Sequence, residues 1–196
     1  MAAMFSLLSS DPAACETAAK ILLNGGVAII PTDTVYGLAA HPNHPAAVAR
    51  LQTIKARENP KPVALLIDAP ESLARFTQNP PPLATALAQR HWPGALTLVL
   101  DTPGGTEGFR VPNHAFCRGL IARCGGALRV TSANLTGQMP ATTSAAALEA
   151  LGLTADLLID DGPSPGGLAS TVIRIARDNT PALLREGAIP FFQCLP

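Results

Sequence analysis

A cluster of positive side chains is the first feature of this sequence that could do chemistry. Lys55, Arg57 and Lys61 lie within the stretch KARENPKP, and the chain has one other lysine, Lys20. A guanidinium binds phosphate oxygens as a planar fork and an ammonium binds them as a point charge, so this trio matches a polyphosphate. Solvated loop charges would produce the same pattern, and this stretch alone leaves both interpretations open.

Polar side chains also follow apolar runs at three places in the chain. They belong to the stretches PTDTVYGLAA, TSANLTG and GGLASTVIRI. In α/β proteins ligands bind at the carboxyl ends of strands, so these residues could form a polar rim on an apolar sheet. Ordinary turn chemistry could account for any one of them alone. The side chains concerned are Thr32, Asp33, Thr34, Tyr36, Thr131, Ser132, Asn134, Thr136, Ser170 and Thr171.

The elements that must position these residues alternate between helices and strands. Hydrophobic spacing and start and stop signals predict helices over 12–24, from Pro45 to near Arg57, and over 70–77, 82–91, 115–124 and 143–151. Short apolar runs predict strands over 27–30, 63–67, 96–100, 157–160, 170–175 and 182–185, and ALRVTSAN (127–134) is expected to be a strand that runs into a loop. This order indicates an α/β fold, and the strand-rich end favours a mixed rather than a purely parallel sheet.

Composition limits the classes of protein to consider. The chain has 196 residues, 47% of them hydrophobic, and a formal net charge of zero, which suits one domain over 1–196 and disfavours a general nucleic-acid binder. No apolar stretch reaches membrane-spanning length and the first residues lack a signal-peptide pattern, so we expect a cytoplasmic protein. Cys15, Cys117, Cys124 and Cys194 form no CxxC pair and are expected to be buried or idle thiols.

Seven short motifs make the sequence similar to the YrdC/Sua5 family. In chain order they are PTDTVYGL, KAR followed by KP, HWPGALTLVL, FRVPNH, TSANLTG, STVI and LREGAI, and they extend from about residue 31 to 189. The resemblance implies an open, twisted, mixed α/β sheet with flanking helices and a concave basic cavity, in the short single-domain bacterial form. It also implies a cytoplasmic threonylcarbamoyl-AMP synthase, a nucleotidyltransferase of the tRNA modification N6-threonylcarbamoyladenosine (t6A).

The implied reaction uses L-threonine, bicarbonate or carbon dioxide, and ATP. The amine of threonine is carboxylated and the carbamate oxygen attacks the α-phosphate, which releases pyrophosphate. No protein nucleophile is required, in agreement with the absence of a recognisable Ser-His-Asp or Cys-His arrangement in the sequence. Catalysis would depend on positioning and on electrostatic stabilisation of the phosphate charge. The resemblance further implies Mg²⁺ bound with ATP and no metal site of the protein itself. It names a tRNA threonylcarbamoyl-transferase as the downstream partner and allows weak tRNA binding.

The family motifs assign roles to individual residues of this chain. The catalytic group would be Lys55, Arg57, Ser132 and Asn134. The ATP-binding group would be Lys55, Arg57, Lys61, Thr106, Asn134, Thr142 and Arg185. The threonine-binding group would be Thr34, Arg110, Ser132 and Ser170, with Asp33 and Tyr36 shaping the same pocket. The chain departs from the family pattern at Glu58 and at Leu66. It also departs in the stretch TEGFR, which replaces the usual apolar run before the arginine.

Two other functions are compatible with parts of the sequence. A paralogue could use the same surface to bind RNA or a nucleotide without this chemistry, although aromatic residues make up only 4% of the chain. Carbamoyl transfer in hydrogenase maturation uses a similar domain, but the acylphosphatase-like and zinc-finger segments expected there are absent from this sequence. As a loop cation, Lys55 is expected to contribute little to stability, so Lys55→Ala should leave the melting temperature nearly unchanged.

Overall fold

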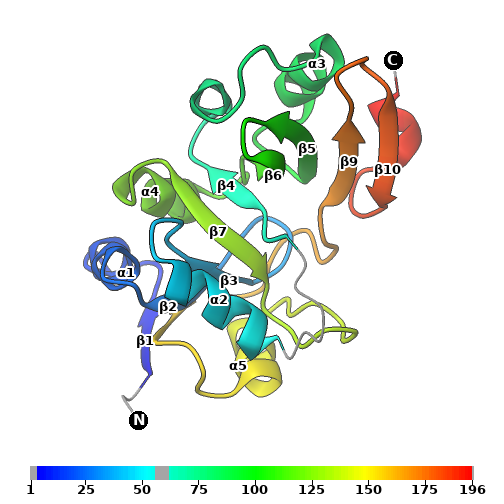
Figure 1. Ribbon diagram of the computed structural model, residues 1–196. Helices are drawn as coiled ribbons and strands as arrows, with labels where there is room; N and C mark the ends of the chain where they lie inside the picture. Colours follow the sequence, from blue (N-terminus) through cyan, green and yellow to red (C-terminus); the bar gives the residue numbers. More distant parts are fainter. Residues whose placement is uncertain (1–3, 56–61, 196) are drawn as a thin grey trace.

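The computed structural model describes residues 4–55 and 62–195, and a mixed β-sheet runs through all of this part (Figure 1). The strands are β1 (Phe5–Leu8), β2 (Val27–Ile30), β3 (Gly37–Ala40), β4 (Leu65–Ile67), β5 (Leu96–Thr102), β6 (Gly105–Arg110), β7 (Ala127–Ser132), β8 (Leu157–Asp160), β9 (Thr171–Ile175) and β10 (Pro181–Arg185). The helices are α1 (Ala14–Leu23), α2 (Pro45–Ile54), α3 (Pro82–His91), α4 (Ala115–Arg123) and α5 (Ser144–Leu151), with short 3₁₀ helices η1 (Pro70–Arg75) and η2 (Phe191–Cys194).

The strand order is β1-β8-β2-β3-β7-β4-β6-β5-β9-β10, and the sheet is open at β1 and β10. Pairs β1–β8, β2–β8, β4–β6 and β5–β9 are parallel, whereas β2–β3, β3–β7, β4–β7, β5–β6 and β9–β10 are antiparallel. The prediction of an α/β fold with an open mixed sheet and flanking helices is therefore confirmed.

The sequence analysis missed three strands, and each lacks the usual signal. β3 has the sequence GLAA without a β-branched residue, β6 contains two glycines, and β1 is an exposed edge strand with little apolar alternation. Two helix predictions also need correction. The first helix begins at Ala14 instead of residue 12, because the Asp11 carboxylate accepts a hydrogen bond from the Ala13 amide at 2.8 Å and forms a preceding turn. The segment 70–77 contains a 3₁₀ helix over Pro70–Arg75.

The two parts of the sheet are covered differently. Around β2, β3 and β7 both faces are buried: α1 and α4 pack on the face that carries Ile30 and Ala39, while α2 and α5 pack on the face that carries Ile29 and Leu38. In Figure 1, α1 and α4 lie to the left of this region, α2 crosses in front of β2 and β3, and α5 lies below. Because they are buried on both faces, β2 and β3 are continuous apolar runs in the sequence.

Around β5, β6 and β9 one face of the sheet packs on α3. Among the described residues, no helix packs on the opposite face, which lines the cavity. Leu96, Leu98 and Leu100 of β5 lie in the cluster with α3, as do Phe109 of β6 and Ile173 of β9. Their alternate neighbours must point to the opposite face, because successive side chains of a strand alternate. The period-two pattern of these three strands therefore creates a second surface on the sheet, which forms the wall of the cavity described below.

Two of the four cysteines confirm the expectation of inert thiols. Cys117 and Cys124 are buried in the cluster between α1 and α4 and form no disulfide. Burial raises the pKa of Cys117 to about 12 and that of Cys124 to about 11. Both thiols therefore stay protonated at neutral pH.

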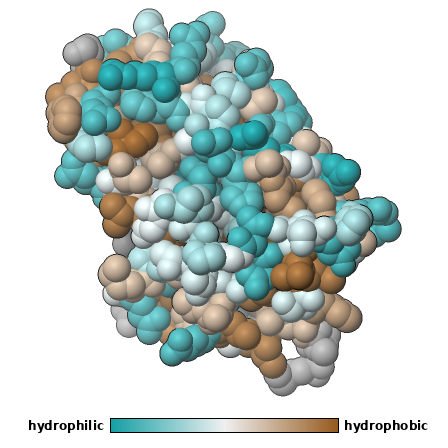
Figure 2. Space-filling model, turned by 180° about the vertical axis from the view of Figure 1, so that it is seen from behind, coloured by the Kyte–Doolittle hydropathy of each residue, from teal (hydrophilic) through white to brown (hydrophobic). Residues whose placement is uncertain are grey.

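The surface of the described part mixes polar and apolar groups. Seen from behind, hydrophilic residues cover most of the face and hydrophobic residues form separate patches (Figure 2). Within residues 4–55 and 62–195, no helix has the length and apolar character needed to cross a bilayer.

Gly37 allows the close packing of β3 and β7 and offers a test of the fold. Gly37 pairs with Ser132, and a Cβ atom at position 37 would lie 2.6 Å from Cγ1 of Val130. We expect Gly37→Ala to lower the free energy of unfolding by about 1–3 kcal/mol, because the added methyl overpacks the sheet. Urea denaturation would measure the change.

Val130→Ala provides the internal control for this prediction. Since the clash is with the Val130 side chain, the double variant Gly37→Ala/Val130→Ala should be more stable than the sum of the two single effects predicts. Strictly additive effects would show that the contact with Val130 is not the reason for glycine at position 37.

Candidate functional site

A cavity of about 480 Å³ lies over the uncovered face of β5, β6 and β9 and extends to β7 and the loop after β2. Residues from widely separated parts of the chain line it. Among them are six residues to which the family resemblance assigns a role: Thr34, Thr106, Arg110, Ser132, Ser170 and Arg185. The structure thus brings together, at one surface, polar residues that the sequence distributes over 150 positions.

Arg110 is bonded to three other residues at the cavity wall. Its Nη2 lies 2.6 Å from Oδ1 of Asp33, its Nη1 donates to Oγ1 of Thr34 at 2.9 Å, and its Nε donates to the Gly94 carbonyl at 3.0 Å. Only 6% of Arg110 is exposed, and burial lowers its pKa while Asp33 opposes that shift. Arg110 therefore ties β6 to the loop after β2 and holds the Thr34 hydroxyl at the cavity wall. Its implied bond to the threonine carboxylate stays a prediction.

Ser170 and Arg185 form a second polar group at the cavity. Nη2 of Arg185 donates to the Ser170 carbonyl at 2.8 Å and to its Oγ at 3.3 Å, and Thr97 Oγ1 lies 2.8 Å from Ser170 Oγ. Desolvation and the nearby positive charge of Arg110 lower the pKa of Arg185. Two guanidiniums thus repel each other across the cavity, and a bound anion would relieve that repulsion.

Tyr36 fixes the loop that carries Thr34 and Asp33. Its ring is fully buried, its hydroxyl donates to the Gly162 carbonyl at 2.7 Å and it accepts from the Asp161 amide at 3.0 Å. Burial raises its pKa, so the phenol remains a neutral hydrogen-bonding group. Tyr36 lines the cavity and joins β3 to the end of β8, and its implied role in a threonine pocket stays a prediction.

Lys55 has an environment that the sequence analysis described incorrectly. It is only 2% exposed, and its Nζ donates to the carbonyls of Ser132 and Asn134 at 2.6 and 2.7 Å. Weaker contacts join Nζ to Ser132 Oγ at 3.3 Å and Asn134 Oδ1 at 3.4 Å. The expectation that Lys55 is a loop cation of little structural importance is therefore wrong, because its ammonium organises the loop after β7.

Other predicted ATP-binding residues differ in their placement. The Asn134 side chain donates to the carbonyls of Leu135 and Gln138, both at 2.8 Å, and thus closes the loop on itself. Neither Asn134 nor Thr142 nor Lys55 belongs to the described residues that line the cavity. The assignments for Arg57 and Lys61, and the departure at Glu58, lie outside the described residues.

The departure in the stretch TEGFR has a structural reason. Glu107 accepts hydrogen bonds from both Nη atoms of Arg129, each at 2.6 Å, across the intervening strand β4. Thr106 on the same strand lines the cavity, whereas Glu107 points to the opposite face because side chains alternate. The acidic residue is therefore paired on the far side of the sheet and leaves Thr106 in the cavity.

Sequence reasoning also missed residues that line the cavity, notably Thr97, Val99, Arg174 and Leu184. The alternation in LTLVL and STVIRI separates inward from outward positions, and it could have identified Thr97, Val99 and Arg174 once the buried face of each strand was known. Leu184 is 57% exposed and carries no sequence signal for a site, because its role in the wall depends on the pairing of β9 with β10.

Known proteins are similar to this chain over most of its length. The family model Sua5/YciO/YrdC, described as "Telomere recombination", matches residues 20–187. The chain belongs to this family. Within the family, it is 34% identical to threonylcarbamoyl-AMP synthase of Bacillus subtilis over 93% of this chain and 56% of that relative. It is 33% identical to a putative threonylcarbamoyl-AMP synthase of Mycobacterium leprae over 88% of this chain and 82% of that relative.

Solved structures of Sua5/YciO/YrdC proteins share the fold. Pyrococcus abyssi Sua5 complexed with L-threonine is 31% identical and superposes with a TM-score of 0.85, covering 91% of this chain and 55% of that one. E. coli YciO is 25% identical with a TM-score of 0.85 and covers all of both chains. The chain thus spans about half the length of the B. subtilis and P. abyssi relatives and the whole length of YciO.

The buried position of Lys55 predicts a loss of stability on its removal. We expect Lys55→Ala to lower the free energy of unfolding by about 2 kcal/mol, because two buried carbonyls lose their donor. For a chain of this size that equals a decrease of about 4–8 °C in the melting temperature, measurable by calorimetry. Lys20→Ala is the matched control, because Lys20 pairs with Glu16 on the surface and its loss should leave the melting temperature unchanged. An equally small effect of Lys55→Ala would contradict the assignment.

Proposed function

We propose that the chain is a threonylcarbamoyl-AMP synthase: it forms L-threonylcarbamoyladenylate and pyrophosphate from L-threonine, bicarbonate or carbon dioxide, and ATP. The observation that carries the proposal is the convergence of Thr34, Thr106, Arg110, Ser132, Ser170 and Arg185 on one cavity. Relatives that match most of this chain bear the name of this activity, and one related structure holds L-threonine.

The geometry suits a reaction in which the protein only binds and orients. The threonine amine and bicarbonate combine to a carbamate with loss of water, and the carbamate oxygen then bonds to the α-phosphorus as the bond to pyrophosphate breaks. The polar groups of the cavity include the hydroxyls of Thr34, Ser132 and Ser170 and the guanidiniums of Arg110 and Arg185. Such groups can hold anionic substrates close together and stabilise charge on the transferring phosphoryl group.

Within this proposal each side chain has a task that its contacts support. Ser170 and Thr34, held by Arg185 and Arg110, would bind the amino acid, and Arg110 would add a positive charge near its carboxylate. Ser132 lies where the cavity meets the loop fixed by Lys55, so it would contact both substrates. Lys55 would then act on the nucleotide through the position of this loop.

Mg²⁺ is proposed to enter as part of the ATP substrate. Asp33, a carboxylate beside the cavity, is already bonded to Arg110, and triphosphate oxygens supply the hard ligands that Mg²⁺ prefers. When bound, the ion would neutralise charge on the leaving pyrophosphate. We propose the cytoplasm as the location and a tRNA threonylcarbamoyl-transferase as the acceptor of the intermediate.

Pyrophosphate release tests this function. Purified protein with MgATP, bicarbonate and L-threonine should release pyrophosphate, and omission of threonine should abolish the release. Ser170→Ala should raise the KM for threonine about tenfold and leave the KM for ATP nearly unchanged, because one hydrogen bond to the amino acid is lost. A folded preparation that releases no pyrophosphate above the threonine-free control would refute the proposed function.

The second function is that of an RNA- or nucleotide-binding paralogue, and the three arginines at the cavity, Arg110, Arg174 and Arg185, are the observation in its favour. The two functions differ in how RNA binding responds to salt and to ATP. RNA binding that falls steeply with salt and persists at saturating ATP would support the paralogue. Displacement of RNA by ATP would support the synthase.

A further inference from the structure

Arg174 lines the cavity, but neither the sequence motifs nor the family resemblance assigns it a role. On the cavity face, Val99 of β5 pairs with Arg174 on one side and with Gly108 on the other. The next position along the same face of β5 is Asp101, which pairs with Thr106. The backbone of Arg174 is therefore level with Gly108, two residues along the sheet from Arg110, and its side chain reaches toward Asp101 at the Thr106 end of the cavity.

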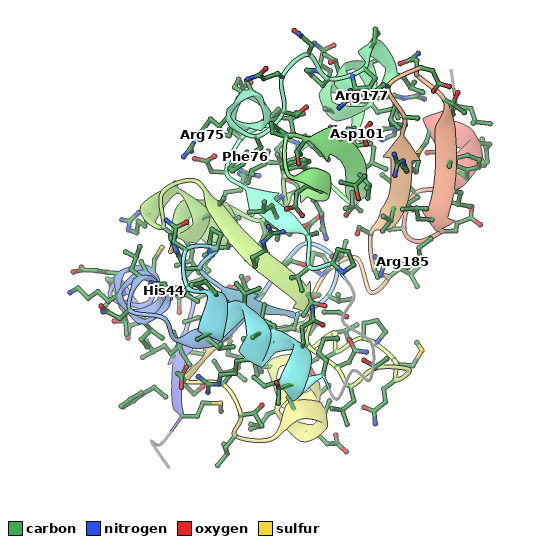
Figure 3. All side chains as sticks on the ribbon, viewed as in Figure 1. His44, Arg75, Phe76, Asp101, Arg177 and Arg185 are labelled. Carbon is green, nitrogen blue, oxygen red and sulfur yellow. The ribbon has the colours of Figure 1, made fainter. Side chains whose placement is uncertain are left out.

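Asp101 fixes the Arg174 side chain. Nη2 of Arg174 lies 3.1 Å from Oδ1 of Asp101, and Nε of Arg177 lies 3.3 Å from Oδ2 of the same carboxylate. Asp101 and Arg177 lie together near one end of the β9–β10 pair, whereas Arg185 lies at the other end (Figure 3). The carboxylate restrains the Arg174 guanidinium and compensates part of its charge, so this end of the cavity is less suited to a polyphosphate than the end near Arg185.

The groups around Arg174 suit a flat, uncharged ligand. Val99, Val172 and Leu184 present apolar surface to the cavity, and Gly108 has no side chain on the same wall. A Cβ atom at Gly108 would lie 3.4–3.7 Å from side-chain atoms of Ala64, Thr97 and Val99, so a planar ring at this position would rest on these side chains. A guanidinium plane stacks on aromatic rings and nucleobases, and it does so best when other contacts hold it in place.

We propose that Arg174, held by Asp101, stacks on the nucleobase of ATP and makes the Thr106 end of the cavity the base-binding end. This inference rests on the proposed function, in which ATP is a substrate. It adds a residue that determines nucleotide affinity, and it orients the nucleotide with its base toward Thr106 and its phosphates toward Ser132 and Arg185.

Binding measurements on Arg174 and Arg177 variants test the proposal. Arg177 shares the same carboxylate, is 84% exposed as a side chain, and does not belong to the described lining of the cavity, so Arg177→Ala is the matched control. We expect Arg174→Ala to weaken ATP and adenosine binding about tenfold in titration calorimetry, with inorganic tripolyphosphate binding unchanged. Arg177→Ala should alter each affinity less than twofold. Arg174→Lys should bind ATP as weakly as Arg174→Ala, because it retains the charge but lacks the plane.

Several outcomes would overturn the proposal. Unchanged ATP affinity in Arg174→Ala, an equal loss for tripolyphosphate, or full recovery in Arg174→Lys would each exclude stacking on the base. A melting temperature of Arg174→Ala equal to that of the wild type shows that the variant is folded, as expected since Asp101 keeps Arg177 as a partner. Wild-type protein that binds ATP but releases no threonine-dependent pyrophosphate would refute the synthase while leaving the role of Arg174 intact. Threonine-dependent pyrophosphate release by the wild type, together with unchanged ATP affinity in Arg174→Ala, would support the synthase and refute the role of Arg174.

Discussion

A buried guanidinium holds the cavity of this protein together. Arg110 bonds to Asp33 and Thr34 of the loop after β2 and to the Gly94 carbonyl before β5, so three segments distant in sequence meet at one side chain. Loss of either member of such a buried pair costs about 3–5 kcal/mol, because the remaining charge has no partner. The position of the Thr34 hydroxyl at the cavity wall therefore depends on Arg110.

The pairing of charges decides what the cavity can bind. Arg110 has Asp33 and Arg174 has Asp101, whereas the described hydrogen bonds of Arg185 are to the neutral oxygens of Ser170. A chain with zero net charge can thus present local positive charge without becoming a general polyanion binder. The separation of a compensated end from an uncompensated end is a simple way to orient a molecule that is anionic at one end and aromatic at the other.

The same physical rule produces the core and the site. In β5, β6 and β9 one set of alternate residues packs on α3, and the other set faces the cavity. The leucines of LTLVL and the threonine between them are therefore both required, the former for burial and the latter for its hydroxyl. Alternate residues of LTLVL thus contribute to the core and to the cavity wall.

The sequence alone determined the order of helices and strands, the mixed α/β class and the residue types of the site, because these depend on local periodicity and on motifs that are continuous in the chain. It failed for β3 and β6, whose glycines and alanines carry no local strand signal and which form only because neighbouring strands pair with them. Only the tertiary structure decided that Lys55 is buried under the loop after β7, that Asn134 closes that loop, and that Arg174 reaches the cavity. The placements of Lys55 and Arg174 depend on strand register and on contacts between residues about 70 or more positions apart, for example between Lys55 and Ser132 or between Asp101 and Arg174, and no local pattern in a single sequence specifies such contacts.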